Sequence, residues 1–372
     1  MQNIPLSRPS ITALERDYVA RVLDSGRLAL GPFVEEFEER MATICGTKHA
    51  VAVSSGTAAL HLIVRSLGIG TGDEVVTTPY SFIASANAAI FEGAQPVFAD
   101  VNPLTYNIDP AAAERAVSDS TAAILAVDVF GLPADWERLE TVATSHGLAL
   151  IDDACEALGA TNGNRRIGSI GNAAAFGFYP NKQITTGEGG CITTDSDELA
   201  ALCRSMRNQG RNDDRFMEHG RLGFNYRMAE LPAAIGCAQL ERLPELLHKR
   251  STIAGWYANH LADCPCVLPP DAPGRSWFVY VIRIPDDYPE ATRDELMQQL
   301  ALNGIQSAPY FPSLHTQPFY RERFGLQPED FPVSANLAKR TLALPFFADM
   351  TEQQVATVAE TVSASISRTT EV

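Results

Sequence analysis

The sequence predicts an α/β protein built on a mostly parallel sheet that is covered by helices on both faces. Short apolar runs of strand length alternate with helical stretches over roughly the first two thirds of the chain, the order typical of such sheets. At 372 residues the chain exceeds the size at which one core keeps growing, and the pattern changes after residue 245. We therefore expect a large domain with an N-terminal arm over residues 1–245 and a smaller C-terminal α/β domain over residues 246–372.

The elements of the large domain follow from the spacing of apolar residues. Helical spacing runs over Ile11–Leu23 and over Val34–Ile44, and Gly46 ends the second helix. The expected strands are Ala50–Val53, Glu74–Thr78, Pro96–Ala99, Ala122–Val127, Ala149–Asp152, Ala173–Phe178 and Cys191–Thr194. The expected helices between them are Thr57–Leu67, Phe82–Phe91, Pro110–Val117, Trp136–His146 and Glu198–Asn208.

The C-terminal part has a different pattern. One long helix is expected from Glu230 through Leu246, and the β-branched and aromatic run Trp277–Ile284 predicts a strand. Thr292-Arg293-Asp294-Glu295 has the pattern of a capping box that opens a helix ending at Gly304. Thr351-Glu352-Gln353-Gln354 has the same pattern and predicts another helix.

The composition is that of an ordinary globular protein with an acidic balance. Hydrophobic residues make up 45% of the chain and charged residues 20%. The net charge of -16, with a pI of about 4.9, disfavours binding to nucleic acid or to an anionic membrane. No run of about 18 apolar residues occurs, and Met1–Pro5 does not begin a signal segment. We therefore expect a cytoplasmic protein without nucleic-acid or membrane partners.

The seven cysteines lack the paired spacing of a metal site. They are Cys45, Cys155, Cys191, Cys203, Cys237, Cys264 and Cys266. Only Cys264-Pro265-Cys266 brings two together, and it lacks the two-residue gap and the second pair of a zinc site. We expect reduced, mostly buried thiols and no metal.

Lys182 is the strongest candidate for a reactive group. It lies between the expected strand Ala173–Phe178 and the glycine-rich run Gly187-Glu188-Gly189-Gly190, so its loop is anchored on both sides. A desolvated lysine amine, or one beside a cation, can form a Schiff base with a carbonyl or with pyridoxal phosphate (PLP). The alternative is an ordinary solvated surface lysine.

Three further candidates precede Lys182 at strand ends. In Ser54-Ser55-Gly56-Thr57, a strand leads into a helix whose first amides can bind a phosphate, although the segment can equally be only an N-cap. Phe82 can stack on a planar cofactor or be a core residue. Of Asp152 and Asp153, one can face a site and hold a pyridine nitrogen protonated while the other is solvated or caps a turn. The alternative is that Asp152 and Asp153 only keep a surface loop soluble.

A phosphate-binding turn, an aromatic ring, a carboxylate and a lysine in this order are far more specific together than any one of them. The chain resembles the sugar aminotransferases of the DegT/DnrJ/EryC1/StrS family, which are fold-type I PLP enzymes. The matching segments are Ser55–Leu60, Asp152–Gly159, Lys182–Gly190, Gly223–Met228, Ala233–Gly236, Gln239–Leu240 and Tyr310–His315.

The resemblance implies a role for each motif residue. Lys182 would form the Schiff base with PLP, Asp153 would pair with the pyridine nitrogen, and Phe82 would stack on the ring. Gly56 and Thr57 would hold the phosphate through their backbone amides.

Other positions implied by the resemblance concern the assembly and the pocket. Glu156 would lie near the cofactor. Asn225 would reach the phosphate of a neighbouring subunit, which implies a homodimer with shared active sites. Two positions depart from the family pattern: Gly177 stands where a phosphate-binding serine is usual, and Ala308 where an arginine is often found. His315 either contacts the sugar or its diphosphate, or is a hydrogen-bonded structural residue.

The resemblance implies a role in amino-sugar and O-antigen or polysaccharide biosynthesis. The resemblance to perosamine synthases within the family implies transfer of an amino group from glutamate to a nucleotide-linked 4-keto-6-deoxy sugar. The alternatives are a 3-keto-sugar aminotransferase acting on another nucleotide carrier and a PLP-binding regulatory protein of the same fold. A PLP-dependent sugar dehydratase is disfavoured, because such family members replace the lysine that matches Lys182 with histidine.

Overall fold

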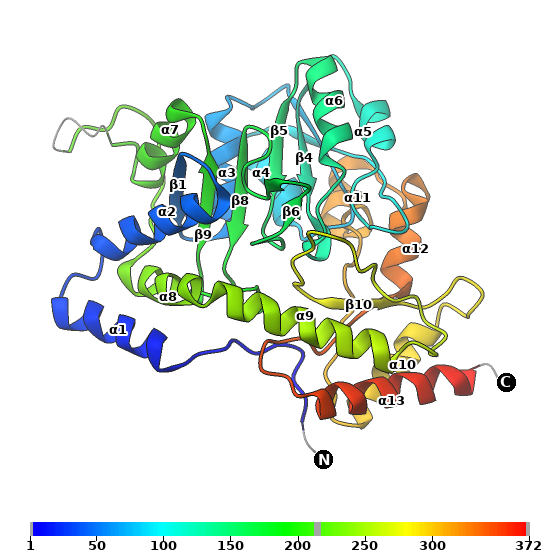
Figure 1. The fold of residues 1–372 in the computed structure, drawn as a ribbon. Helices are drawn as coiled ribbons and strands as arrows, with labels where there is room; N and C mark the ends of the chain where they lie inside the picture. The colour runs from blue at the N-terminus through cyan, green and yellow to red at the C-terminus, as the bar shows by residue number, and fades with distance from the viewer. Residues whose placement is uncertain (1–2, 212–216, 370–372) are drawn as a thin grey trace.

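A seven-stranded sheet forms the centre of the computed structural model, which describes residues 3–211 and 217–369 (Figure 1). Its strand order is β1-β9-β8-β5-β4-β2-β3. The strands are β1 His49–Val53, β2 Glu74–Thr77, β3 Gln95–Phe98, β4 Thr121–Val127, β5 Ala149–Asp153, β8 Ala173–Gly177 and β9 Gly190–Thr194. Only β9 runs antiparallel to its neighbours in this sheet, so the prediction of a mostly parallel sheet is confirmed.

Helices cover both faces of this sheet (Figure 1). They are α2 Pro32–Cys45, α3 Gly56–Ser66, α4 Ala84–Phe91, α5 Pro110–Ala116, α6 Trp136–His146 and α7 Asp197–Arg207. Helix α8 Glu230–Glu241 packs on α2, and α1 Ala13–Ser25 packs on α8. Alternate residues of β8 enter opposite cores, because side chains alternate along a strand. Ala174 and Phe176 lie in the core with α2, whereas Ala173 and Ala175 lie in the core with α3. The strand and helix ranges predicted for the sheet region are confirmed to within two residues.

The C-terminal part packs around a smaller sheet and a third core. Its main elements are α9 Leu243–His260, β10 Tyr280–Arg283, α10 Thr292–Leu302, β11 Thr341–Leu344 and α13 Glu352–Thr369. Strands β10 and β11 are antiparallel, and α9 and α13 lie side by side (Figure 1). Shorter elements complete the described chain: η1 Val129–Gly131, β6 Thr161–Asn162, β7 Arg165–Arg166, η2 Leu314–Thr316, α11 Pro318–Phe324, η3 Pro328–Asp330 and α12 Pro332–Arg340.

Helix α9 joins the two parts of the molecule. Leu246 lies in a core of the large sheet, whereas Ile253 and Tyr257 lie in the core of the small one. The expected domain boundary between residues 245 and 246 falls inside this helix.

Three predictions for this region are wrong in detail. The single helix expected over Glu230–Leu246 is two helices, α8 and α9, because Pro244 has no amide for a continuous helix and fits the first turn of a new one. The strand expected over Trp277–Ile284 is shorter, since only Tyr280–Arg283 finds a partner strand. Thr292 is not an N-cap: Ala291 holds that position without a side-chain bond.

The second expected capping box is confirmed. The Thr351 hydroxyl accepts from the amide of Gln354 at 3.3 Å, and the Gln354 side chain accepts from the amide of Thr351 at 3.0 Å. All seven cysteines are free, and Cys45, Cys191, Cys203 and Cys237 are buried.

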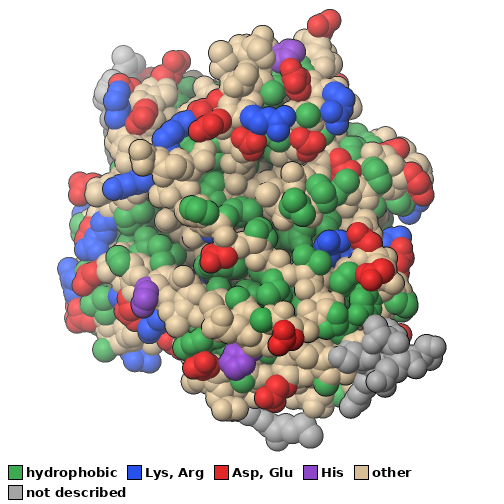
Figure 2. Space-filling model, turned by 45° about the vertical axis from the view of Figure 1, so that its right-hand side comes forward, with side chains coloured by type: hydrophobic (Ala, Val, Ile, Leu, Met, Phe, Trp, Pro, Cys, Tyr) green, Lys and Arg blue, Asp and Glu red, His purple; other side chains and the backbone are tan. Residues whose placement is uncertain are grey.

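On the face drawn in Figure 2, lysine and arginine side chains are scattered among acidic ones rather than gathered in a basic patch. None of the helices in the described residues is long and apolar enough to cross a membrane.

Candidate active site

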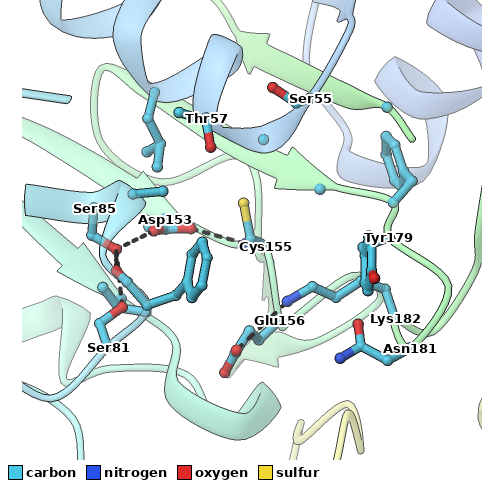
Figure 3. Close-up of a pocket in the computed structure, with 18 of the residues that line it drawn as sticks. Ser55, Thr57, Ser81, Ser85, Asp153, Cys155, Glu156, Tyr179, Asn181 and Lys182 are labelled. Atoms are coloured by element: carbon cyan, nitrogen blue, oxygen red, sulfur yellow. Dashed lines mark hydrogen bonds and ion pairs between the residues drawn. The ribbon is translucent and has the colours of Figure 1, made fainter. Parts of the chain in front are cut away.

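A cavity of about 530 Å³ lies where the parallel strands end, and Tyr310 and Phe311 from the C-terminal part close one side of it. Such strand ends are the usual place for ligands in open α/β sheets. Six of the predicted site residues line the cavity: Gly56, Thr57, Phe82, Asp153, Glu156 and Lys182. Figure 3 shows Lys182 pointing toward Glu156, with Asp153 and Ser85 across the cavity.

Lys182 is held in a tight loop and is largely withdrawn from solvent. Its backbone amide donates to the carbonyl of Tyr179 at 2.9 Å. Its Nζ lies 3.5 Å from Oε1 of Glu156 and 4.1 Å from the centre of the Phe278 ring. With a side chain that is only 16% exposed, Lys182 is not an ordinary surface lysine.

The glycine-rich run after Lys182 is required by one positive φ and one close approach. Gly187 has φ +82°, a conformation that L side chains rarely adopt. A Cβ at Gly190 would lie 2.3 Å from the carbonyl oxygen of Ser55. These glycines therefore let the lysine loop return along the strand that leads to the phosphate-binding turn.

Glu156 is the buried acidic partner of Lys182. Its Oε2 accepts from the amide of Phe130 at 2.8 Å. Burial raises the pKa of Glu156, against the opposing influence of the Lys182 ammonium. The pair thus brings one acid and one amine together at the same wall of the cavity.

The N-terminus of α3 forms the opposite end of the cavity. Ser55 is its N-cap and accepts from the amide of Ala58 at 3.1 Å. The first-turn amides of Gly56 and Thr57 have no carbonyl one turn earlier, as at any helix start, and are free to bind an anion. A Cβ at Gly56 would lie 2.9 Å from Sγ of Cys155 and 3.2 Å from Cα of Gly177, so a side chain here would force its neighbours to move. Ser55 can therefore cap α3 while the amides of Gly56 and Thr57 remain available for an anion, so the two roles expected for this segment do not exclude each other.

Asp153 lies at the floor of the cavity at the end of β5. Its Oδ2 accepts from the Ser85 hydroxyl at 2.7 Å, and its Oδ1 accepts from the amide of Cys155 at 3.2 Å. The Phe82 side chain lines the same cavity and is 63% exposed, so it is not a core residue. An exposed ring beside a buried, fixed carboxylate fits a flat aromatic ligand with a basic ring nitrogen.

Asp152 corrects the expectation for the acidic pair. It points to the opposite face, as alternation along β5 requires, but it is fully buried rather than solvated or capping a turn. Its Oδ2 accepts from the amide of Gly168 at 3.3 Å. The carboxyl of Asp128 is its hydrogen-bonding neighbour and accepts from Ala134 N at 2.7 Å and from Nε1 of Trp136 at 3.0 Å.

Burial raises the pKa of Asp128 to about 7 and that of Asp152 well above its usual range. Because the folded state holds a proton that the unfolded chain releases near pH 4, the free energy of unfolding falls as pH rises from about 4 to about 7. The slope is up to about 1.4 kcal/mol per pH unit. Asp128→Asn removes the part of this titration that belongs to Asp128, so its unfolding free energy relative to wild type should rise over that interval. Urea unfolding of both proteins at a series of pH values measures this; parallel curves would contradict the raised pKa of Asp128.

Arg250 was not predicted and supports both Lys182 and its aromatic neighbour. This buried residue of α9 donates from Nη2 to the carbonyl of Lys182 at 2.8 Å and from Nη1 to the carbonyl of Phe278 at 3.0 Å. Burial lowers its pKa to about 10. Arg250 lies beyond the helix expected over Glu230–Leu246, and nothing in the sequence around it indicates this contact. Ser85, the partner of Asp153, lies in an alanine-rich helix and was missed as well.

Two predicted residues do not line the cavity. His315 is fully buried; its Nδ1 lies 2.8 Å from the Ser313 hydroxyl and its Nε2 3.3 Å from the carbonyl of Pro328. These bonds fit the second of the two roles expected for His315, that of a hydrogen-bonded structural residue. We assign His315 no contact with substrate. Asn225 is exposed and lies outside the cavity lining of its own chain.

Together, the fold and this cavity define the class of PLP-dependent aminotransferases. The model of the DegT/DnrJ/EryC1/StrS aminotransferase family matches residues 9–363, so the chain belongs to that family.

Relatives match over nearly the whole length. The chain is 40% identical to a GDP-perosamine synthase of Caulobacter vibrioides, covering 95% of this chain and 96% of that one. It is 39% identical to the spore coat polysaccharide biosynthesis protein SpsC of Bacillus subtilis, covering 96% of each.

Solved structures share the fold. Helicobacter pylori PseC, an aminotransferase involved in the biosynthesis of pseudoaminic acid, has a TM-score of 0.95 at 28% identity, covering 99% of this chain and 100% of that one. Streptococcus pneumoniae Spr1654, a putative sugar aminotransferase solved in a PLP form, has a TM-score of 0.94 at 26% identity, covering 99% and 100%. The chain therefore has the fold-type I architecture of PLP-dependent sugar aminotransferases.

The missing serine at Gly177 gives a gain-of-affinity prediction. A Cβ there would lie 3.4 Å from Sγ of Cys155, an ordinary contact, so Gly177→Ser fits. An added hydroxyl that donates to the phosphate should tighten PLP binding about tenfold, since a hydrogen bond to a charged group contributes roughly 1.5–3 kcal/mol. Absorbance titration of cofactor-free protein with PLP measures this. Gly177→Ala is the matched control, and equal affinities of the two variants would refute the prediction.

Proposed function

We propose that this chain transfers the amino group of glutamate to the keto carbon of a nucleotide-linked 4-keto-6-deoxy sugar. The observation that carries the proposal is the withdrawn Lys182 amine facing a cavity whose floor is the fixed Asp153 carboxylate. The sugar class is supported by 40% and 35% identity to two relatives named GDP-perosamine synthase, of which the chain covers 96% each.

In this proposal the cavity residues divide the binding and the chemistry among them. PLP, when bound, supplies a ring that withdraws electrons from the carbon losing its proton. Asp153 keeps the ring nitrogen protonated, the exposed ring of Phe82 stacks on it, and the amides of Gly56 and Thr57 hold the phosphate. Nζ of Lys182 would hold the cofactor covalently and, once displaced, would act as the base that takes the proton from the α-carbon of the amino donor.

Glu156 and the cavity wall support the proton transfer. Oε1 of Glu156 lies 3.5 Å from Nζ of Lys182, and its role is to orient this amine. Tyr310 and Phe311 shield this side of the cavity from water, which strengthens the electrostatic contacts inside.

We further propose a homodimer in which Asn225 completes the phosphate site of the partner subunit. Its turn is held by backbone bonds: Tyr226 N donates to Arg207 O at 2.9 Å, and Ser54 N donates to Tyr226 O at 2.8 Å. Asn225 is thus fixed beside the phosphate-binding turn yet exposed, as a residue offered to another chain would be.

The test is to incubate the PLP-loaded protein with glutamate and a panel of keto-sugars on GDP, UDP, dTDP and CDP. The expected result is an amino-sugar from one 4-keto carrier together with 2-oxoglutarate, detected by mass, and NMR then gives the ring position. Product only from a 3-keto sugar would replace the proposed substrate. No amino transfer to any sugar would refute the proposed activity and favour a regulatory protein.

A further inference from the structure

The Cys264-Pro265-Cys266 segment places two thiols together on the C-terminal part of the molecule. The amide of Cys266 donates to the carbonyl of Cys264 at 2.7 Å, which closes a three-residue turn around Pro265. Residues two positions apart are separated by at most about 7 Å when the chain is extended, and a turn brings them closer, toward the range of about 4.4–6.8 Å that a disulfide spans. The backbone is therefore already arranged for a bond between the two sulfurs.

The two thiols also differ in a way that suits a reaction in two steps. The ionisation of the two thiols is linked, and the Cys266 thiol and the Ser363 hydroxyl both favour the charged form of Cys264, which lowers its pKa. The interaction with Cys266 lowers the pKa of Cys264 to about 7, against the effect of burial, and the same interaction raises the pKa of Cys266. Cys264 thus has thiolate character and Cys266 keeps its proton until the first step has occurred.

The other five cysteines lack this combination. Cys45, Cys191, Cys203 and Cys237 are buried, and burial raises the pKa of each. Cys155 is half-buried, but burial raises its pKa as well. Only Cys264 and Cys266 are both half-buried and adjacent to a second thiol, the arrangement of a sensor cysteine beside a resolving one.

We propose that Cys264 and Cys266 form a modification site that exchanges with low-molecular-weight disulfides and closes to a reversible intramolecular disulfide. The Cys264 thiolate attacks one sulfur of the reagent, the reagent S–S bond breaks, and one reagent thiolate leaves. Cys266 then loses its proton to water and attacks the Cys264 sulfur, which releases the second reagent thiolate. Two protein thiols are oxidised, and the reagent disulfide is reduced to two thiols that take up the two protons.

The site does not depend on the proposed amino transfer. Neither Cys264 nor Cys266 lines the active-site cavity. Cys264 N donates to Leu261 O at 3.0 Å beyond the end of α9, and the neighbouring Val267 pairs with Arg283 at the end of β10. We therefore expect disulfide closure to leave the rate of amino transfer within about twofold, as for a change away from the active site.

The experiment uses the full PLP-loaded chain and oxidised glutathione as the probe. After incubation, the protein is unfolded, its remaining thiols are alkylated, and it is digested with trypsin. The expected product Ser251–Arg275 contains Cys264 and Cys266 and no other cysteine, lysine or internal arginine. It should lack both alkyl groups and be lighter by two hydrogens than the reduced peptide, and dithiothreitol should reverse the change. The buried residues Cys45, Cys191, Cys203 and Cys237 do not react with glutathione in the folded protein, so all four should carry the alkyl group after unfolding.

Two serine variants test the order of the steps. Cys266→Ser should trap glutathione on Cys264, because the resolving thiol is absent. Cys264→Ser should leave Cys266 alkylated, because its proton is retained. The proposal is overturned if the wild-type peptide stays fully alkylated or keeps a glutathione adduct that never closes. Trapping on Cys266 instead would overturn the assigned roles.

Discussion

Lys182→Ala should lower the rate of amino transfer by at least about ten-thousandfold, because general-base catalysis alone contributes 10²–10⁴. The variant also loses the amine that attaches the cofactor covalently. The shape of the site should survive, since the contacts that hold this loop use the backbone: Lys182 N to Tyr179 O at 2.9 Å and Arg250 Nη2 to Lys182 O at 2.8 Å. Steady-state kinetics with glutamate and an accepted keto-sugar measure the loss.

The same variant should still bind pyridoxamine phosphate, which needs no covalent link, and this binding can be followed by absorbance. Lys249→Ala is the matched control. Its side chain is 38% exposed and pairs with Glu245 at 2.7 Å, so its removal should leave turnover within about twofold. Undiminished activity of Lys182→Ala would refute the assignment.

The positions of the cavity residues could be predicted because they depend on one simple rule. Parallel strands end at the same edge of a sheet, so the residues that follow β1, β5 and β8 meet there. Gly56, Asp153 and Lys182 were located in this way, from apolar runs and the glycines beside them. The family resemblance then supplied their proposed chemical roles, which spacing alone could not.

The contacts that hold these residues could not be predicted, because they join segments far apart in the chain. Arg250, which lies 68 residues after Lys182, donates a hydrogen bond to the carbonyl of Lys182. Helical periodicity indicates only which face of a helix is buried, so it does not show such a contact. Asp152 was expected to be solvated or to cap a turn, since a single sequence does not show that the carboxyl of Asp128, at the end of the neighbouring strand β4, is its buried neighbour. His315 was left between two roles for the same reason: the bonds to Ser313 and Pro328 are formed by the loop's tertiary path.

Asp153→Asn should lower kcat by roughly 10²–10³, the usual cost of removing one preorganised electrostatic contact in an active site. An amide has nearly the same shape as the carboxylate but carries no charge to keep a ring nitrogen protonated, so the ring withdraws electrons less well. The amide oxygen can still accept from Ser85, whose hydroxyl lies 2.7 Å from Oδ2. The cavity and the affinity for PLP should therefore change little, and the loss should fall on kcat rather than on KM.

Ser85→Ala separates the charge of Asp153 from its orientation. This variant keeps the carboxylate and removes one hydrogen bond to it, worth roughly 1.5–3 kcal/mol for a charged group. Cys155 N still holds the other oxygen at 3.2 Å, so kcat should fall about tenfold, less than in Asp153→Asn. Kinetics and PLP absorbance spectra of both variants test this order. If Asp153→Asn kept wild-type kcat, the ring nitrogen would not need this carboxylate to stay protonated, and the proposed role of Asp153 would be wrong.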